Sequence, residues 1–333
     1  MKMLFGALSF NREIPSGQSR RWSGPARKGK ISRMSVCDLS VVVPSYNSEK
    51  TIRRCLRSLA AQKTSLKFEV IVVDSSADGT ADLVASEFAW VKMLCQAQRL
   101  YPGAARNIGI QNASGKIIAF LASDCVAHPL WLETRYRLHQ QGFAGVGGAI
   151  ANANPQSIVG WANYFMEFIF SLPGRPREEI TGKIIHNLSY RREVFDRYGL
   201  FDPSLPMGED TVFNRQMMLR GEPMIFEPEI VAGHINPTSL RELLVHHFQH
   251  GCHFAMACRN GQLAFFKMPS SLARRVLRLY QPLLFYPILR VKSCFANVVR
   301  HQPRLIPQLL LCFPLFLLGI FSAAIGIAVG SLR

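Results

Sequence analysis

The sequence predicts an α/β fold with a mixed, mostly parallel sheet and helices on its faces. From Leu39 onward, short β-branched runs alternate with stretches of helical apolar spacing, the pattern of parallel strands joined by helical crossovers. The chain has 333 residues, of which 48% are hydrophobic and 18% charged, enough for one large α/β domain and an appendage. This composition excludes a disordered chain and a small disulfide-stapled protein.

The elements follow one another in a regular order. The runs LSVVV, FEVIVV and IIAFL predict three of the strands, and two further apolar runs complete the set, at 39–43, 68–73, 91–95, 117–121 and 144–150. The segments between them have the spacing of helices, at 49–61, 79–87, 103–113 and 130–141. Because open α/β sheets bind ligands at the carboxyl ends of their strands, we expect the chemistry in the loops after these runs.

The charge is concentrated at the two ends of the chain. The formal charge is +17, with a net +7 over residues 1–36 and +10 over 243–333, whereas 37–242 are neutral. A neutral body with basic ends is typical of a protein on an anionic membrane surface, and we expect no nucleic-acid partner. The expected organisation is a basic disordered tail over 1–36, a globular domain over 37–240 and basic amphipathic membrane-proximal helices over 241–304.

The final segment, 305–332, has no charged residue and is dominated by apolar side chains. About 20 such residues span a bilayer, so the segment is expected to be transmembrane, or re-entrant because Pro307 and Pro314 interrupt a helix. The basic stretch before it favours the cytoplasmic side for the globular domain. Eight cysteines without a CxxC pair favour a reducing compartment, so the expected location is the inner or plasma membrane.

Polar residues follow three of the predicted strands. Tyr46 and Asp74 set an aromatic ring and a carboxylate at neighbouring strand ends, where they can stack on a planar base and accept its N–H. Asp124 follows the next apolar run, and a carboxylate there can ligate a hard divalent cation that also holds phosphate oxygens. For the first two loops, ordinary turn chemistry with Ser48 and Asp78 as helix caps is the alternative.

The ordered set of these motifs resembles glycosyltransferase family 2, which has the GT-A fold. The resemblance extends over about residues 38–240, and a hydrophobic, basic C-terminal tail also recurs among membrane-associated members of the family. The matching segments are 41–47 (VVVPSYN), 72–80 (VVDSSADGT), 103–107 (GAARN), 120–124 (FLASD) and 208–210 (GED).

The resemblance implies an inverting enzyme that moves a sugar from a nucleotide-sugar donor to a hydroxyl of a saccharide or lipid-linked acceptor. It implies a divalent cation, Mn²⁺ or Mg²⁺, held by Asp124 with His234 as a further ligand. Asp210 is then the general base that takes the acceptor's proton, and Glu209 orients the acceptor. The residues implied to bind the donor are Pro44, Tyr46, Glu49, Asp74, Asp78, Arg106 and Ser123.

Two features of the sequence qualify this reading. Ala122 stands where the family's DxD motif has its first acid, which puts a ribose or metal contact in doubt. No QxxRW string follows Asp210, which favours addition of a single sugar over polymerisation. The alternatives are a nucleotidyl or phosphosugar transferase using the same pocket, and a degenerate, non-catalytic membrane protein that binds nucleotide sugars.

Several residues also have purely structural interpretations. Glu209 and Asp210 suit a helix N-terminus, where acids complement the dipole, and a lone His234 suits a packed or capping side chain. The spacing of His246 and His250 suits zinc, but a polar helix face beside the site is the other interpretation. The Pro/Gly-rich stretch 171–184 is either a loop that closes over the substrates or a surface connector.

Overall fold

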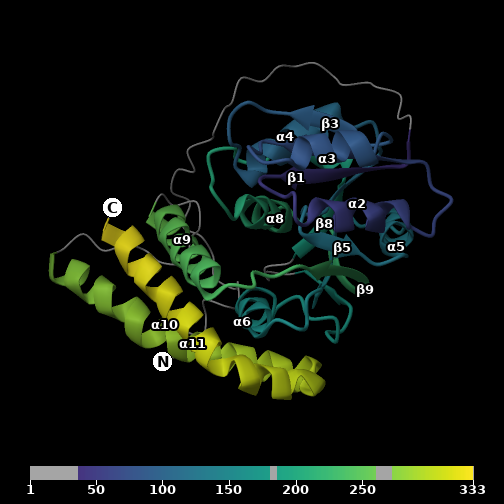
Figure 1. The fold of residues 1–333 in the computed structure, drawn as a ribbon. Helices are drawn as coiled ribbons and strands as arrows, with labels where there is room; N and C mark the ends of the chain where they lie inside the picture. The colour runs from purple at the N-terminus through teal and green to yellow at the C-terminus, as the bar shows by residue number, and fades with distance from the viewer. Residues whose placement is uncertain (1–36, 181–185, 260–271, 333) are drawn as a thin grey trace.

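The computed structural model describes residues 37–180, 186–259 and 272–332 (Figure 1). The predicted basic tail, 1–36, lies outside these residues. The described part of the chain forms an α/β body with three long C-terminal helices beside it, on the side where α6 lies (Figure 1).

The first half of the body is a parallel sheet with the order β3-β2-β1-β4, which confirms the predicted crossover pattern. The register pairs Ser45 with Asp74, so the first two strands end at the same level. Their carboxyl ends therefore form one edge, as the sequence predicts. The strands are β1 (Leu39–Ser45), β2 (Phe68–Asp74), β3 (Lys92–Cys95) and β4 (Ile117–Phe120), connected by α2 (Ile52–Ala60), α3 (Thr80–Glu87) and α4 (Pro102–Asn112).

The second half extends the same sheet in the order β4-β8-β6-β9-β5, with β7 paired to β9. β8 is antiparallel to both of its neighbours, so the sheet is mixed. Sequence patterns missed β5 because it is three residues long, and β8 because its sequence HNLSYR is largely polar. The elements are β5 (Cys125–Ala127), α5 (Trp131–Gln140), β6 (Gly145–Asn152), α6 (Ile158–Glu167), β7 (Glu178–Glu179), β8 (His186–Arg191), α7 (Arg192–Tyr198), α8 (Glu209–Leu219) and β9 (Met224–His234).

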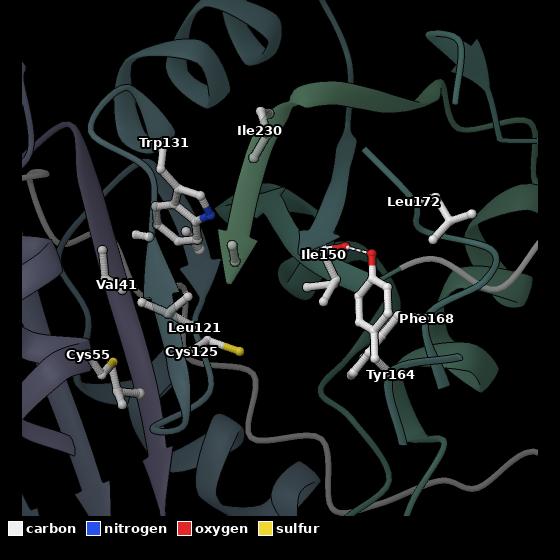
Figure 2. Close-up of a cluster of buried hydrophobic side chains, with 14 of the residues drawn as sticks. Val41, Cys55, Leu121, Cys125, Trp131, Ile150, Tyr164, Phe168, Leu172 and Ile230 are labelled. Atoms are coloured by element: carbon white, nitrogen blue, oxygen red, sulfur yellow. Dashed lines mark hydrogen bonds between the residues drawn. The ribbon is translucent and has the colours of Figure 1, made fainter. Parts of the chain in front are cut away.

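The core lies on both faces of the sheet. In β1, Val41 and Val43 belong to one buried cluster and Val42 belongs to another, as the alternation of side chains along a strand requires. Figure 2 shows part of the first cluster, where the Tyr164 hydroxyl of α6 donates to the carbonyl of Ile150 in β6 at 2.9 Å. Helix α6 is thereby fastened to the centre of the sheet.

The C-terminal helices pack closely against one another and on the body. A Cβ atom on Gly326 would collide with the carbonyl of Phe248, and one on Gly330 would lie 2.5 Å from the carbonyl of Cys252. Small residues thus allow two helix backbones to touch, as in tightly crossed helix pairs. The helices are α9 (Leu240–Arg259), α10 (Leu272–His301) and α11 (Ile306–Leu332), with a short 3₁₀ turn at Pro303–Leu305 before α11.

The segment expected to be transmembrane or re-entrant forms one helix, with Pro314 inside it. Among the described residues, Pro303–Leu332 is the one stretch long and apolar enough to cross a membrane, with a mean hydropathy of 2.4 and 39% of that window buried inside the protein. Of the stretch 171–184, the described part forms β7 and packs against the end of α10, where Gly174 approaches the carbonyl of His301. Residues 181–185 lie outside the described residues.

Candidate active site

A pocket of about 200 Å³ lies at the carboxyl ends of β1 and β4, beside the N-terminus of α8. Eight elements contribute to its wall, so residues far apart in the sequence meet there. Five of the predicted site residues line it, Pro44, Arg106, Asp124, Asp210 and His234, and so does Ala122, which stands at the position of the first DxD acid.

Asp124 and His234 approach each other because of strand register. β5 pairs with β9 so that Cys125 lies opposite His234, which brings Asp124 Oδ2 within 3.4 Å of His234 Nε2. On its other side, His234 Nδ1 donates to Oδ1 of Asn236 at 2.9 Å, since the Asn236 amide nitrogen is committed as a donor to Asn152. In the neutral ring the lone pair therefore sits on Nε2 and faces Asp124.

This donor set fits a divalent cation. The ligand atoms of Asp124, Cys125 and His234 lie within 4.8 Å of one another. A carboxylate oxygen and an imidazole whose far nitrogen is hydrogen-bonded form the usual pattern of a metal-binding pair with its supporting contact. Burial raises the pKa of the Cys125 thiol, which leaves the carboxylate and the imidazole as the stronger ligands.

The same two groups shift each other's protonation. Burial alone disfavours charge on Asp124, but the neighbouring His234 outweighs it and lowers the pKa of the Asp124 carboxyl. For His234, burial acts to lower the pKa, yet Asp124 raises it to about 9. Without a metal the two residues therefore form an ion pair at neutral pH.

Asp210 lies at the start of α8 and lines the same pocket. Gly208 has φ of +78°, a left-handed conformation that glycine adopts without strain and that starts the helix at Glu209. The backbone N–H of Thr211 donates to Asp210 Oδ1 at 2.7 Å, and the other carboxylate oxygen lies 3.7 Å from Nη1 of Arg106. One oxygen is thereby fixed while the carboxylate still lines the pocket.

Glu209 points away from the pocket wall. Its side chain is 3% exposed and forms an ion pair with Arg106, and burial raises the pKa of Glu209 while the guanidinium opposes this. The pair packs under α4, where a Cβ on Gly103 would lie 3.0 Å from Cγ of Glu209. This geometry makes Glu209 a partner that positions Arg106, and Glu209 is not among the residues that line the pocket.

The remaining predicted residues lie in the two loops that follow β1 and β2. These loops are joined by hydrogen bonds, including Ser48 N–H to Thr80 at 3.0 Å and Glu49 N–H to Asp78 at 3.3 Å. Asp78 also accepts from the backbone N–H of Thr80, the first residue of α3, but the N-cap of that helix is Gly79 and not Asp78 as expected. Asp74 is buried and accepts from Ser76, whereas Tyr46 is 41% exposed.

Tyr46 and Ser123, both expected to bind the donor, already have partners within the protein. The Arg99 guanidinium lies 4.3 Å from the centre of the Tyr46 ring, so that ring face already has a cation on it. The Ser123 hydroxyl lies 2.7 Å from that of Ser48, which joins the loop before Asp124 to the loop after β1.

Sequence reasoning missed several residues of the pocket. His186 and Tyr190 come from β8, a strand that the patterns did not reveal. Phe168 lies just after α6, with ring centres 5.2 Å from His186 and 4.8 Å from His234. Sequence reasoning also missed Asn236, the partner of His234. The signal for it was weak: Asn236 follows His234 by two residues, a spacing that places both side chains on one side of an extended chain.

This fold and this site define a GT-A-type domain. Residues 40–199 match the family model described as Glycosyl transferase family 2. This part of the chain, just under half of its length, is therefore similar to glycosyltransferase family 2.

Two curated relatives and one solved structure illustrate the likeness. "Glycosyltransferase AglE" of Haloferax volcanii is 29% identical over 203 residues, covering 59% of this chain and 66% of the relative. "Succinoglycan biosynthesis protein ExoO" of Rhizobium meliloti is 33% identical over 215 residues, covering 60% of each. The chain thus spans somewhat less than two thirds of the length of these relatives.

The structural likeness extends further along the chain. The mannosyltransferase PcManGT from Pyrobaculum calidifontis, solved with GDP-Man and Mn²⁺, has a TM-score of 0.55 and 20% identity, covering 89% of this chain and 87% of that one. At this identity the comparison establishes the fold.

Proposed function

We propose that this protein is an inverting, non-processive glycosyltransferase that moves a sugar from a nucleotide-diphosphate sugar to a hydroxyl acceptor. The observation that carries the proposal is the pocket itself, because an Asp124–His234 pair and an Asp210–Arg106 pair line the same cavity. One pair suits a cation and the donor diphosphate, and the other suits proton removal beside a positive charge.

The nucleoside end of the donor is proposed to lie over the loops after β1 and β2. A pocket of about 200 Å³ is below the usual 300–1,000 Å³ of ligand sites, so a nucleotide sugar must extend beyond it. The joined loops offer the Tyr46 ring and the Asp74 carboxylate in that direction, with Glu49 and Asp78 beside them. Displacement of Arg99 from the Tyr46 ring by a base is part of this proposal.

The chain's own residues divide the chemistry between them. Asp210 removes the acceptor's proton as its oxygen attacks the anomeric carbon, and the Thr211 N–H holds the carboxylate in place. Arg106, held by the buried Glu209, places a positive charge beside Asp210 and lies near the donor phosphates. Asp124 and His234 would hold a divalent cation, Mn²⁺ or Mg²⁺, which would supply positive charge for the departing nucleoside diphosphate.

The enzymatic test is a product assay over a panel of nucleotide sugars, with Mn²⁺ and then Mg²⁺. Release of nucleoside diphosphate is expected for a sugar donor. Release of diphosphate would instead identify a nucleotidyl transferase, and binding without turnover by the wild type would identify a non-catalytic protein. Asp210→Asn should lower kcat by about 10²- to 10⁴-fold with donor KM unchanged. Asp196→Asn, on the exposed face of α7, is the control.

The C-terminal helices are proposed to hold the protein on the cytoplasmic face of the inner or plasma membrane, near a lipid-linked or envelope-polysaccharide acceptor. Their outer surfaces carry large exposed apolar side chains on α10 and α11, flanked by Lys292, Arg300 and Arg304. Apolar area together with nearby cations is the composition of a surface that binds anionic lipid. The exposed apolar residues are Leu284, Phe285, Ile288, Val299, Leu310, Leu311, Leu318, Phe321, Ile325 and Leu332.

The packing of α11 favours a helix that lies along the membrane over one that crosses it. Its C-terminal half touches the backbone of α9 at Gly251, Gly326 and Gly330. A crossing α11 would carry that part of α9, with its imidazoles, into the hydrocarbon, which is costly. A helix lying in the interface buries its exposed face in lipid and keeps α9 on the protein side.

Vesicle flotation tests this orientation. Leu311→Asp places a charge on a 65% exposed position of α11 and should lower binding to vesicles containing phosphatidylglycerol by at least fivefold. Leu219→Asp makes the same change at an equally exposed position of α8, also 65%, and should leave binding unchanged. Equal binding of both variants would refute the assigned surface.

A further inference from the structure

A second cluster of metal-ligating side chains lies outside the pocket, between α6 and α9. Ligand atoms of Glu167, His246 and His247 lie within 4.8 Å of one another. His250 is one helical turn further on, with its ring centre 6.1 Å from that of His246 and 6.5 Å from that of His247. Three imidazoles on one helix thus surround a carboxylate from another helix.

The helical spacing explains how the rings come together. Positions 246 and 250 are four residues apart and 247 and 250 are three apart, so His250 shares a face with both of the others. Glu167, the last residue of α6, approaches this face and forms an ion pair with His246. His246 and His250 are solvent-exposed, which leaves an ion a path from the solvent.

Two buried amides fix the protonation of His247. The Asn163 amide nitrogen donates to Oδ1 of Asn236 at 2.9 Å, so Oδ1 of Asn163 is the acceptor that faces His247 Nε2 at 3.0 Å. His247 Nε2 therefore carries the proton and the ring's lone pair sits on Nδ1. An imidazole held by an amide at its far nitrogen is the supporting arrangement that metal-binding histidines use.

The same amides lead to the candidate active site. Oδ1 of Asn236 accepts from Asn163 and also from Nδ1 of His234. A chain of hydrogen bonds thus runs from His247 through two amides to the histidine that faces Asp124. All three intermediate contacts are between buried or partly buried groups.

We propose that Glu167, His246 and His247, together with His250, bind a second divalent cation of the zinc type, separate from the Asp124–His234 pair. Three imidazoles and one carboxylate match the ligands that Zn²⁺ prefers, whereas Mg²⁺ requires mostly oxygen ligands. The nearby Arg290 guanidinium donates a hydrogen bond to the carbonyl of Met166 and not to Glu167. The Glu167 carboxylate is therefore available to balance the charge of the ion. This site goes beyond the proposed transfer reaction.

Such an ion would fasten α9 to the pocket wall. Glu167 immediately precedes Phe168, whose ring packs against both His186 and His234. A metal that joins Glu167 to three residues of α9 therefore restrains one wall of the pocket and the helix that holds α11. The role is structural: the ion stabilises the junction between the body and the membrane-facing helices.

The test uses the full-length protein without a histidine tag, purified in detergent and treated with chelator. Zn²⁺ is titrated against a colorimetric chelator, in wild type and in an Asp124→Asn background that weakens the other site. We expect one Zn²⁺ to remain bound in the Asp124→Asn protein, not displaced by a 100-fold excess of Mg²⁺, and the melting temperature of that protein to rise with Zn²⁺.

Matched variants separate this cluster from other histidines. His250→Ala and Glu167→Gln should each weaken Zn²⁺ binding at least tenfold and abolish the rise in melting temperature. His253→Ala, on the same helix, should bind Zn²⁺ as wild type does, because the charged neighbour of His253 is Arg99 and not Glu167. Circular dichroism of the metal-free variants checks that they fold, and Glu167→Gln replaces His250→Ala if the latter does not.

Two results would overturn the proposal. The first is the same Zn²⁺ affinity in Glu167→Gln as in wild type. The second is the absence of Zn²⁺ from the Asp124→Asn protein after equilibration at micromolar metal, which would identify the Glu167–His246 contact as an ion pair alone.

Discussion

The adjacent acids Glu209 and Asp210 should have opposite phenotypes, although both touch Arg106. Glu209 is 3% exposed and Asp210 22%, so only Glu209 leaves a buried charge uncompensated when it is neutralised. Removing one partner of a buried pair costs about 3–5 kcal/mol. In Glu209→Gln, the Asp210 carboxylate remains 3.7 Å from Nη1 of Arg106 and offsets part of this loss. We therefore expect about 2–3 kcal/mol of destabilisation.

At about 2–4 °C per kcal/mol, the melting temperature of Glu209→Gln should fall by about 5–10 °C. Asp210→Asn should keep stability within about 0.5 kcal/mol, because Asp210 is only partly buried and an Asn oxygen can still accept from the Thr211 N–H, while turnover falls by two to four orders of magnitude. Thermal unfolding and release of nucleoside diphosphate are measured on both variants. A Glu209→Gln protein that melts as wild type does but has lost turnover would refute the positioning role and make Glu209 the reacting carboxylate.

Three further predictions follow from individual contacts. Ala122→Asp adds a carboxylate to the pocket lining and should lower the Mn²⁺ concentration for half-maximal activity about tenfold, whereas Ala122→Asn, of equal size, should not. Gly326→Ala forces α11 away from the carbonyl of Phe248 and should cost about 1–3 kcal/mol in thermal unfolding, against a negligible change for the exposed Ile325→Ala. Burial lowers the pKa of His139 to about 3, so below pH 6.5 the unfolded chain binds a proton that the folded chain does not. The free energy of unfolding should therefore fall by about 1 kcal/mol from pH 6.5 to 5.5. His139→Gln should reduce this dependence, measured as melting temperature against pH.

The parallel half of the fold was readable because three of its strands, β1, β2 and β4, pack side chains into the buried clusters on both faces, whereas the edge strand β3 has no buried residue. In β1, consecutive valines pack into two different cores, so the strand appears in the sequence as an uninterrupted apolar run. A helix with one buried face would instead have apolar residues three or four positions apart. β8 lacked this signal: it is antiparallel, and its Ser189 and His186 bind other side chains within the body. The sequence therefore indicated the sheet but not β8, the strand that joins its two halves.

The site residues also fall into those that local sequence predicts and those that depend on packing between distant elements. Asp124 follows an apolar run directly, so a strand end predicts its place, and Asp210 follows a glycine whose left-handed φ begins a helix. Arg106 and Glu209, 103 residues apart, meet because α4 crosses α8 at Gly103, a packing that no local pattern encodes.

Which ring nitrogen of His234 carries the proton also depends on contacts with elements that are distant in the sequence. Its Nδ1 is set by Asn236, whose orientation depends on Asn152 and Asn163, in β6 and α6. Its Nε2 faces Asp124 only because β5 and β9 pair in one register, and a slip of one residue would turn one of the two side chains to the other face of the sheet. A residue type at the right distance along the chain therefore identifies a candidate ligand, whereas its usable nitrogen is determined by strands and amides that are distant in sequence.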